Sequence, residues 1–313
     1  MAFAGAMAVA MVLDALIGWP DRLYARIGHP VTWLGRLIDA LDAHWNREQD
    51  GPWMRRTAGT AAALIVITVA STLGWLLQTP LVSGWNHVFF LGVLAWPFVA
   101  LRSLYEHVSA VARPLGSGDV ETARAAVSMI VGRDPAKLDE AGIARATIES
   151  LAENASDGVV APVFWGVLFG LPGIFGYKAI NTLDSMIGHR SERHQYFGWA
   201  AARIDDVANF VPARLTGMLF ALVGTDPKTA FACMSRDGSR HRSLNAGWPE
   251  AAMAASLSVR LCGPRFYDGK PADEPWLNES ARDPVASDIG RGLILYIRAM
   301  AGLAGLLVIL AFV

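Results

Sequence analysis

The chain has 313 residues, of which 53% are hydrophobic and 18% are charged, and its mean hydropathy is +0.33. Soluble domains carry about 25% charged residues, so this composition argues against a soluble domain. The formal net charge of −1 excludes a general basic field for nucleic acid, and Cys233 and Cys262 form neither a CxxC pair nor a Cys/His zinc quartet.

Six apolar runs approach the roughly 20 residues that a helix needs to cross a bilayer. The first has no Lys or Arg before it, which favours a retained helix over a cleaved signal peptide. We therefore predict an all-α polytopic integral membrane protein with about five to six membrane segments, forming a single membrane domain over residues 1–313. The runs cover residues 2–19, 57–77, 88–101, 159–179, 210–223 and 292–313.

The fourth run, residues 159–179, contains Gly166, Gly170 and the pair Pro172-Gly173. Such residues break helices, and membrane proteins tolerate them where neighbouring helices satisfy the freed backbone groups. A full crossing would also separate residues 181–206 from the acidic residues that precede the run. We expect this segment to be re-entrant or broken.

Three polar blocks, residues 18–56, 102–157 and 225–291, separate the apolar runs. The first two each contain six Lys or Arg residues, whereas residues 78–87 contain none. The positive-inside rule therefore places these two blocks in the cytoplasm and the N-terminus outside. The third block is rich in Gly, Pro, Asp and Arg, which predicts an irregular cytoplasmic loop with short helices.

The second block is expected to be helical towards its end. Asp134-Pro135 fits an N-cap followed by proline, and residues 139–153 are good helix formers in which Arg145 and Glu149 are spaced for an i,i+4 pair. Glu149, Glu153 and Asp157, with Asn154, supply the oxygen ligands that Mg²⁺ prefers. An ordinary helix end with a surface Arg145–Glu149 pair is the alternative.

A second polar cluster follows the broken run. Asn181 and Asp184 share a helical face, and His189-Arg190 places cations just beyond it. The alternative is a polar helix exit. A zinc set of His189, Glu192 and His194 matches no helical metal spacing and is disfavoured.

A third cluster contains adjacent carboxylates. Asp205 and Asp206 precede Asn209 by about one helical turn, and like charges repel unless a cation lies between them. A charged helix N-terminus would explain the same residues. Arg214 lies within the next apolar run, where an arginine needs an anionic partner such as an Asp or a substrate phosphate.

The loop of residues 235–247 suits phosphate binding because it combines Arg236, Arg240 and Arg242 with glycines and hydroxyl groups. Arginines that serve only to set membrane topology would give a similar pattern. There is no G-x4-G-K-[ST] motif, so nucleotide would not be bound through a Walker P-loop.

Five motifs follow one another along the chain. They are Asp14…Gly18…His29-Pro30-Val31…Gly35, Glu153-Asn154-Ala-Ser-Asp157-Gly158…Pro162, Asn181-Thr-Leu-Asp184-Ser-Met-Ile-Gly188, Asp205-Asp206-Val-Ala-Asn209…Pro212-Ala-Arg214 and Ser235-Arg236-Asp237…His241…Ser243-Leu-Asn245-Ala-Gly247. Taken together and in this order, these motifs closely resemble the adenosylcobinamide-phosphate synthase family, the CobD/CbiB group. The resemblance covers residues 14 to about 270. One position departs from the family pattern: Trp19 stands where many members carry Asp, so no ligand role is expected there.

The resemblance implies a ligase of the bacterial inner membrane, with its active site in the cytoplasm. Such a ligase condenses adenosylcobyric acid with (R)-1-aminopropan-2-ol or its O-phosphate and uses ATP and Mg²⁺. Its partners would be the corrinoid, the amino alcohol, the lipid bilayer and other membrane enzymes of late cobalamin assembly, and no nucleic acid. A non-catalytic membrane sensor and a corrinoid transporter remain alternatives.

Three groups of residues are predicted to form the site. We expect Glu153, Asp157, Asp184, Asp205 and Asp206 to converge around one cytoplasm-facing cavity, because all three acidic clusters lie at membrane boundaries. The catalytic set is Asp184, Asp206, Glu153, Asp157 and His189, of which one carboxylate or His189 would be the general base that deprotonates the attacking amine. The metal set is Asp184, Asp206, Asp205, Asn181 and Asn209. The set that binds ATP or phosphate is Arg190, Arg214, Arg236, Arg240, Arg242 and Asn245.

Overall fold

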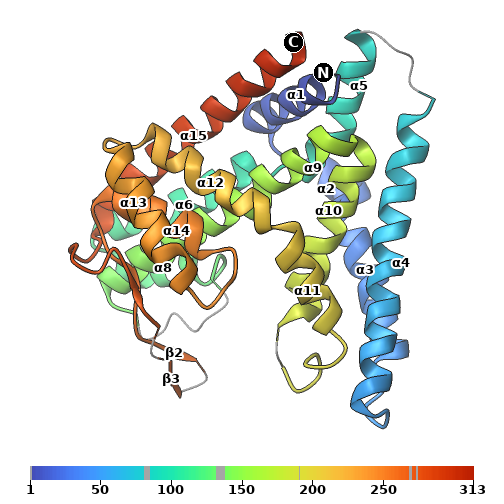
Figure 1. Ribbon diagram of the computed structural model, residues 1–313, viewed down its shortest axis with the longest axis horizontal. Coiled ribbons are helices and arrows are strands. Elements are labelled where there is room, and N and C mark those ends of the chain that lie inside the picture. The colour runs from blue at the N-terminus through green and yellow to red at the C-terminus, as the bar shows by residue number, and fades with distance from the viewer. Residues whose placement is uncertain (1, 81–84, 132–137, 190, 268–269, 273) are drawn as a thin grey trace. The chain divides into compact units, whose positions relative to one another are not determined.

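The computed structural model describes residues 2–80, 85–131, 138–189, 191–267, 270–272 and 274–313 (Figure 1). These residues are almost entirely helical, which confirms the predicted fold class. The chain divides into two compact units, each assembled from segments that are distant in sequence. Unit 1 comprises Met1–Ala100, Ala161–Asn209 and Leu306–Val313, and unit 2 comprises Leu101–Val160 and Phe210–Gly305.

Unit 1 is built around the long helix α4. Its interior is formed largely by small residues, which let helices approach closely in a membrane protein. Its helices are α1 (Ala2–Ile17), α2 (Asp21–Ile27), α3 (Pro30–Trp45), α4 (Pro52–Gln78), α5 (Trp85–Ala95), the short 3₁₀ helix η1 (Trp96–Phe98), α9 (Ala161–Phe169), α10 (Leu171–Leu183), the π-helix η3 (Asp184–Gly188) and α11 (Trp199–Ala208).

Helices α4 and α10 pack side by side and antiparallel (Figure 1). A Cβ added at Gly74, near the end of α4, would lie 2.6 Å from the carbonyl oxygen of Leu171. At the other end of α4, a Cβ added at Gly59 would lie 1.9 Å from the carbonyl oxygen of Phe197. Residues 184–189 and 191–198 therefore lie towards the N-terminal end of α4, and Arg55 of that end donates a 2.5 Å hydrogen bond to the carbonyl of Arg193.

The fourth apolar run is broken at Gly170, as the sequence predicts. Gly170 has φ +69°, in the left-handed region that glycine adopts at little cost. The chain stops as α9 and restarts as α10, whose first amide, that of Leu171, donates a 2.8 Å hydrogen bond to Oε1 of Gln78. This bond satisfies one of the backbone donors that every helix N-terminus exposes.

Unit 2 combines helices with four very short strands, which the sequence analysis did not predict. Strands β1 and β4 pair antiparallel, as do β2 and β3. The elements are α6 (Leu101–Gly116), α7 (Val120–Val127), α8 (Glu140–Ala155), the π-helix η2 (Ser156–Val160), α12 (Phe210–Val223), α13 (Pro227–Asp237), the 3₁₀ helix η4 (Gly238–Arg240), α14 (Gly247–Leu257), β1 (Leu261–Cys262), β2 (Arg265–Tyr267), β3 (Lys270–Ala272), β4 (Trp276–Leu277) and α15 (Ala286–Phe312), whose last turns belong to unit 1.

Three helical stretches among the described residues are long and apolar enough to cross a membrane: Pro52–Gln78, Asn86–Gly116 and Ala286–Phe312. Two bent pairs raise the number to five if each pair is one span. Ala2–Ile17 with Asp21–Trp45 bends by 107°, and Trp199–Ala208 with Phe210–Val223 bends by 45°. These findings support a multi-pass membrane protein, and the run at 159–179 is not among the candidate spans.

Candidate functional site

Two acidic motifs coincide with π-helical turns, in which the backbone bonds from residue i to i+5. Asp157 lies in η2, directly after α8, and Asp184 is the first residue of η3, directly after α10. π-turns are rare, are costly inside α-helices and occur frequently at functional sites. The two π-turns therefore indicate that the orientation of the Asp157 and Asp184 side chains matters for function.

The side chain of Asp184 folds back over its own turn, where Gly188 leaves room for it. A Cβ added at Gly188 would lie 2.0 Å from Oδ1 of Asp184. The pKa of the Asp184 carboxyl is raised, chiefly because the group is buried. The charge of Asp206 also raises this pKa, whereas the charges of His189 and Arg203 lower it. Two like charges in a half-buried place form an environment that a cation would stabilise.

The neighbouring carboxylates on α11 have separate partners within unit 1. Asp206 forms a 2.8 Å ion pair with Arg203. Asp205 accepts a 3.0 Å hydrogen bond from the amide of Asn209, and Oδ1 of Asn209 in turn accepts a 2.8 Å bond from the hydroxyl of Tyr177. Because Asn209 is fully buried and engaged on both sides, these contacts favour a role in positioning Asp205.

The remaining predicted residues of this region differ in accessibility. Asn181 accepts a 3.3 Å hydrogen bond from Lys178, and His189 is exposed at the end of η3. Arg190 lies outside the described residues. Unit 1 therefore brings Asp184 and Asp206 together, with His189 and Arg203 near enough to affect the charge of Asp184.

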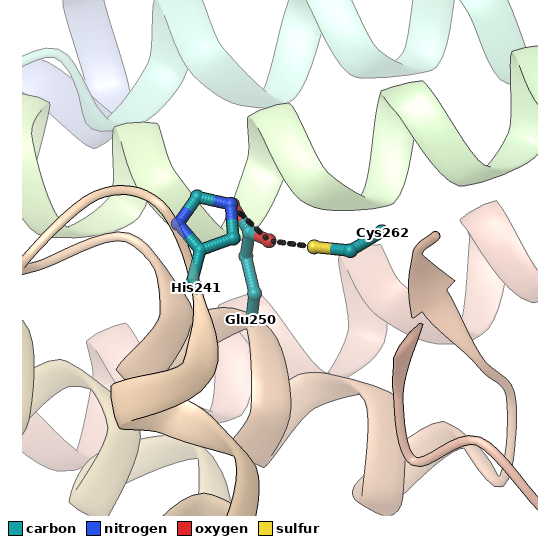
Figure 2. Close-up of side chains that lie close together, drawn as sticks. All are labelled: His241, Glu250 and Cys262. Carbon is teal, nitrogen blue, oxygen red and sulfur yellow. Dashed lines mark hydrogen bonds and ion pairs between the residues drawn. The ribbon is translucent and has the colours of Figure 1, made fainter. Parts of the chain in front are cut away.

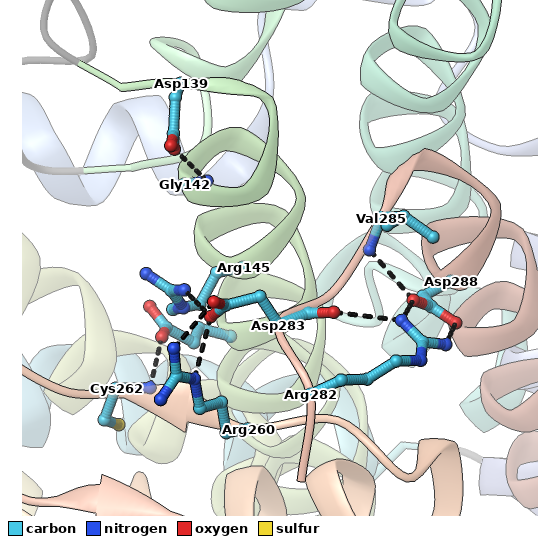
Figure 3. Close-up of polar contacts among 10 residues, drawn as sticks. Asp139, Gly142, Arg145, Arg260, Cys262, Arg282, Asp283, Val285 and Asp288 are labelled. Carbon is cyan, nitrogen blue, oxygen red and sulfur yellow. Dashed lines mark hydrogen bonds and ion pairs between the residues drawn. The ribbon is translucent and has the colours of Figure 1, made fainter.

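The acidic cluster of α8 belongs to unit 2, so its convergence with Asp184 stays a prediction. Glu153 and Asn154 are exposed, and Asp157 is half-buried. Helix α8 begins after the N-cap Asp139, whose carboxylate accepts a 2.7 Å bond from the amide of Gly142 (Figure 3). The predicted N-cap, Asp134-Pro135, lies outside the described residues.

The alternative interpretation, a surface Arg145–Glu149 pair, does not fit the contacts of the described residues. Arg145 instead forms an ion pair with Asp283, which also receives two hydrogen bonds from Arg260 (Figure 3). Glu149 is 5% exposed, and its Oε1 accepts a 2.7 Å bond from the amide of Cys262. The i,i+4 spacing would allow the local pair, but Arg145 instead contacts the carboxylate of Asp283, which lies 138 positions further along the chain.

The arginine loop is organised by a carboxylate that the sequence analysis did not single out. Asp237 is 1% exposed and accepts hydrogen bonds from Arg236 at 2.9 and 2.7 Å, from the amide of Asn278 at 2.9 Å and from Arg240 at 3.5 Å. Arg242 lies 3.9 Å from Glu274. All three arginines are exposed, but Arg236 is held by short hydrogen bonds to Asp237, whereas Arg240 and Arg242 make longer ionic contacts.

We expect Asp237→Asn to lower the thermal stability of the protein. Burial alone would raise the pKa of Asp237, but the hydrogen bonds from Arg236 and Asn278 hold it at about 2, below its usual 3.8. A depressed pKa means that the charged form stabilises the fold above pH 4, and that this contribution disappears as the pH falls towards 2. Thermal unfolding in detergent should show this acid sensitivity in the unaltered protein and less of it in the variant. An unchanged melting temperature at pH 7 would contradict the assignment.

In the part of the chain that the structure describes, Arg214 makes its hydrogen bonds and aromatic contacts with neutral groups. Among the residues that the structure describes, it donates to the carbonyl of Phe210 at 2.6 Å and to Oδ1 of Asn245 at 3.4 Å. Its guanidinium lies 3.6 Å from the ring centroid of Phe210 and 4.4 Å from that of Trp248. Aromatic faces orient a guanidinium while leaving its donors available to an anion.

A further cluster in unit 2 joins His241, Glu250 and Cys262, whose potential ligand atoms all lie within 4.8 Å of one another (Figure 2). The sequence analysis noted His241 only within a motif and missed Glu250. The missed signal was a single carboxylate in the otherwise apolar stretch Gly247–Leu257, all of which but Trp248 is buried.

Comparisons with protein families and with individual proteins agree on one family. Residues 7–296 match the family described as CobD/Cbib protein. A protein of Rhodobacter capsulatus named cobalamin biosynthesis protein CobD is 59% identical over 303 residues, covering 97% of this chain and 96% of its own. Proteins with the same name are 45% identical in Sinorhizobium sp, over 98% of both chains, and 43% identical in Brucella anthropi, over 96% of this chain and 95% of the relative. No solved structure matches. The chain belongs to the CobD/CbiB family of cobalamin biosynthesis proteins.

Proposed function

We propose that this protein is an ATP- and Mg²⁺-dependent amide ligase that joins adenosylcobyric acid to (R)-1-aminopropan-2-ol or its O-phosphate. Family membership over nearly the whole chain supports a role in cobalamin biosynthesis. The observation that carries the enzymatic part is the half-buried carboxylate of Asp184 on the π-turn η3, whose pKa burial and the charge of Asp206 on α11 raise, because a sensor has no need of such a carboxylate cluster.

The donor set around Asp184 fits magnesium. Asp184, Asp205 and Asp206 offer only oxygen atoms, and Mg²⁺ binds through one or two carboxylates together with water and substrate phosphate. Asp184 and Asp206 would hold the ion, and Asp205, which Asn209 positions, would supply a further oxygen ligand. The bound ion would neutralise charge on the transferred phosphoryl group.

The chemistry explains the need for ATP. A carboxylate acylates an amine only when one of its oxygens becomes part of a leaving group. Transfer of the γ-phosphoryl group to the corrinoid carboxylate gives an acyl phosphate and ADP; the amine then attacks the acyl carbon, and phosphate leaves. This sequence needs positioned cations more than a nucleophilic side chain.

Arg214, Arg240 and Arg242 are the cations of unit 2 that we assign to phosphate. Arg214 is stacked between two rings beside Asn245, and Arg240 and Arg242 are exposed on the adjoining loop. Arg236 is a weaker candidate because Asp237 already accepts two of its hydrogen bonds.

We expect Arg214→Gln and Arg240→Ala each to raise the KM for ATP or for the phosphorylated amine by roughly 10- to 100-fold, the loss of one charge-assisted hydrogen bond of about 1.5–3 kcal/mol. Steady-state kinetics at limiting ATP and at limiting amine measure this effect. Arg102→Gln is the matched control, since Arg102 forms an exposed pair with Glu106. If the Arg214 and Arg240 variants and the control gave the same constants as the unaltered enzyme, these arginines would not bind phosphate.

Single turnover with adenosylcobyric acid, ATP-Mg²⁺ and each amine tests the proposed function. We expect one amide product and ADP in detergent solution. The antiparallel packing of α4 and α10 puts η3 at the Arg55–Arg56 end of α4, which supports a cytoplasmic site in the inner membrane. Corrinoid uptake by vesicles without amide formation would indicate a transporter instead.

A further inference from the structure

The second half of the proposed reaction needs a base that is shielded from water, whereas His189 is exposed and the carboxylates of Asp184 and Asp206 are only half-buried. An alkyl amine is an ammonium ion near neutral pH, and it cannot attack an acyl phosphate until it loses a proton. A suitable acceptor would be a shielded carboxylate that first binds the ammonium and then takes its proton. The cluster of His241, Glu250 and Cys262 in unit 2 has this character (Figure 2).

Glu250 lies at the centre of the cluster. Its side chain is 4% exposed, and Figure 2 shows its carboxylate between the His241 ring and the Cys262 thiol. Oε2 accepts a 3.0 Å hydrogen bond from Sγ of Cys262 and lies 3.8 Å from Nε2 of His241. Glu250 is also in the first turn of α14, where the helix dipole favours the ionised carboxylate.

The tautomer of His241 is fixed by its other ring nitrogen. The backbone amide of Ser243 donates a 3.0 Å hydrogen bond to Nδ1, so Nδ1 carries no proton and the neutral ring carries it on Nε2. Nε2–H then faces the Glu250 carboxylate. A metal-binding histidine has the opposite arrangement, since it donates from the nitrogen that does not hold the metal. The geometry therefore favours a proton-handling site over a metal site.

Two backbone features beside the cluster are unusual, a positive φ at Cys262 and a close approach of Gly247 to His241. Cys262 has φ +61°, a left-handed conformation that costs a residue with a side chain about 1–3 kcal/mol. This conformation accompanies two contacts of Cys262, its thiol to Glu250 and its amide to the buried carboxylate of Glu149. A Cβ added at Gly247 would lie 2.4 Å from Cβ of His241, so the start of α14 can approach the ring only with glycine there.

We propose that Glu250 binds the ammonium group of the amino alcohol and accepts its proton, with the Nε2–H of His241 positioning the carboxylate. This inference rests on the proposed ligase function. The ammonium N–H bond breaks, its proton passes to a carboxylate oxygen of Glu250, and the freed electron pair forms the new C–N bond. The acyl C–O bond then breaks, and the second amine proton leaves with the phosphate. Arg240 and Arg242 flank His241 in sequence, which suits an amine that also carries a phosphate.

Hydroxylamine separates this step from the activation step. It is largely uncharged near neutral pH, so it captures an acyl phosphate without a base. With adenosylcobyric acid, ATP-Mg²⁺ and hydroxylamine, we expect both the unaltered enzyme and Glu250→Gln to form the corrinoid hydroxamate. With the amino alcohol, Glu250→Gln should form the amide at least about 100-fold more slowly, the usual contribution of a general base. Glu106→Gln, an exposed glutamate on α6, is the control and should behave as the unaltered enzyme.

Three outcomes would overturn the inference in different ways. If the unaltered enzyme gave no hydroxamate, the proposed ligase function itself would fail. If Glu250→Gln made amide at the normal rate, or lost hydroxamate and amide equally, Glu250 would not be the base. If the purified protein held one equivalent of zinc that Cys262→Ser released, the cluster would be a metal site.

A binding measurement on the unaltered protein keeps the proposal testable even if Glu250→Gln does not fold. Calorimetry should compare (R)-1-aminopropan-2-ol O-phosphate with isopropyl phosphate, which lacks the ammonium group. We expect the amine to bind at least tenfold more tightly. Equal affinities would contradict an ammonium site.

Discussion

Replacing Asp184 by Asn should abolish amide formation while leaving the affinity for adenosylcobyric acid nearly unchanged, and Asp206→Asn should do the same. A metal-bound carboxylate matters most when charge develops on the transferred phosphoryl group, so its loss lowers kcat far more than it weakens substrate binding. Loss of one preorganised charge-stabilising group costs about 100- to 1,000-fold in kcat. Single-turnover kinetics and direct corrinoid binding measure the two effects separately.

Gly188→Ala provides a geometric control for the same site. The variant keeps every carboxylate, but its added Cβ would occupy the place of the Asp184 oxygen 2.0 Å away and force that side chain to turn. We expect a loss of kcat comparable with that of Asp184→Asn. Near-normal kcat in both aspartate variants would exclude this mechanism, and release of AMP and pyrophosphate by the unaltered enzyme would indicate an acyl adenylate instead.

Gly59→Ala should produce the largest loss of stability among simple glycine variants of α4. The added Cβ would lie 1.9 Å from the carbonyl oxygen of Phe197, a backbone atom that cannot rotate away. Overpacking of this kind costs about 1–3 kcal/mol or more. Because Phe197 and Gly198 precede α11, the displacement should also reduce activity by moving Asp205 and Asp206.

Gly302→Ala is the matched control, since no atom lies within 4 Å of a Cβ added there in α15. That substitution should be neutral or slightly stabilising, because alanine is the better helix former by about 0.5–1 kcal/mol. Thermal unfolding of both variants in detergent gives the comparison. Equal melting temperatures would show that α4 and the segment before α11 can separate without cost.

The helical membrane character was predictable because it depends on local composition. The run 57–77 lies within α4 and all but the last residue of the run 292–313 lies within α15, and the break near Gly170 follows from its Gly-Leu-Pro-Gly sequence. The short strands β1 to β4 were missed because each has only two or three residues, too few for an alternating pattern to appear. Helices α2 and α3 in residues 18–56 were likewise expected only as a polar block.

The candidate site was predictable as a set of residue types and less so as a geometry. The Asp184 and Asp206 motifs are separated by only 22 positions, and unit 1 brings them within electrostatic range. The contacts of Glu149 and Arg145 depended on Cys262 and Asp283, both more than 100 positions away, and local spacing carries no information about such partners. Glu250 was recognisable only as an isolated charge among buried neighbours.

The two π-turns also make the protein sensitive to the number of residues in the chain at these places, in addition to their side chains. A π-turn accommodates one residue more than the α-helical turn it replaces. Removing one residue from Asp184–Gly188 would restore the ordinary helical register and rotate the preceding α10 by about 100° relative to the chain that follows. The same holds for Ser156–Val160 between α8 and α9. Single-residue insertions and deletions there would therefore redirect whole helix faces, so the number of residues in each turn is itself a determinant of where the carboxylates point.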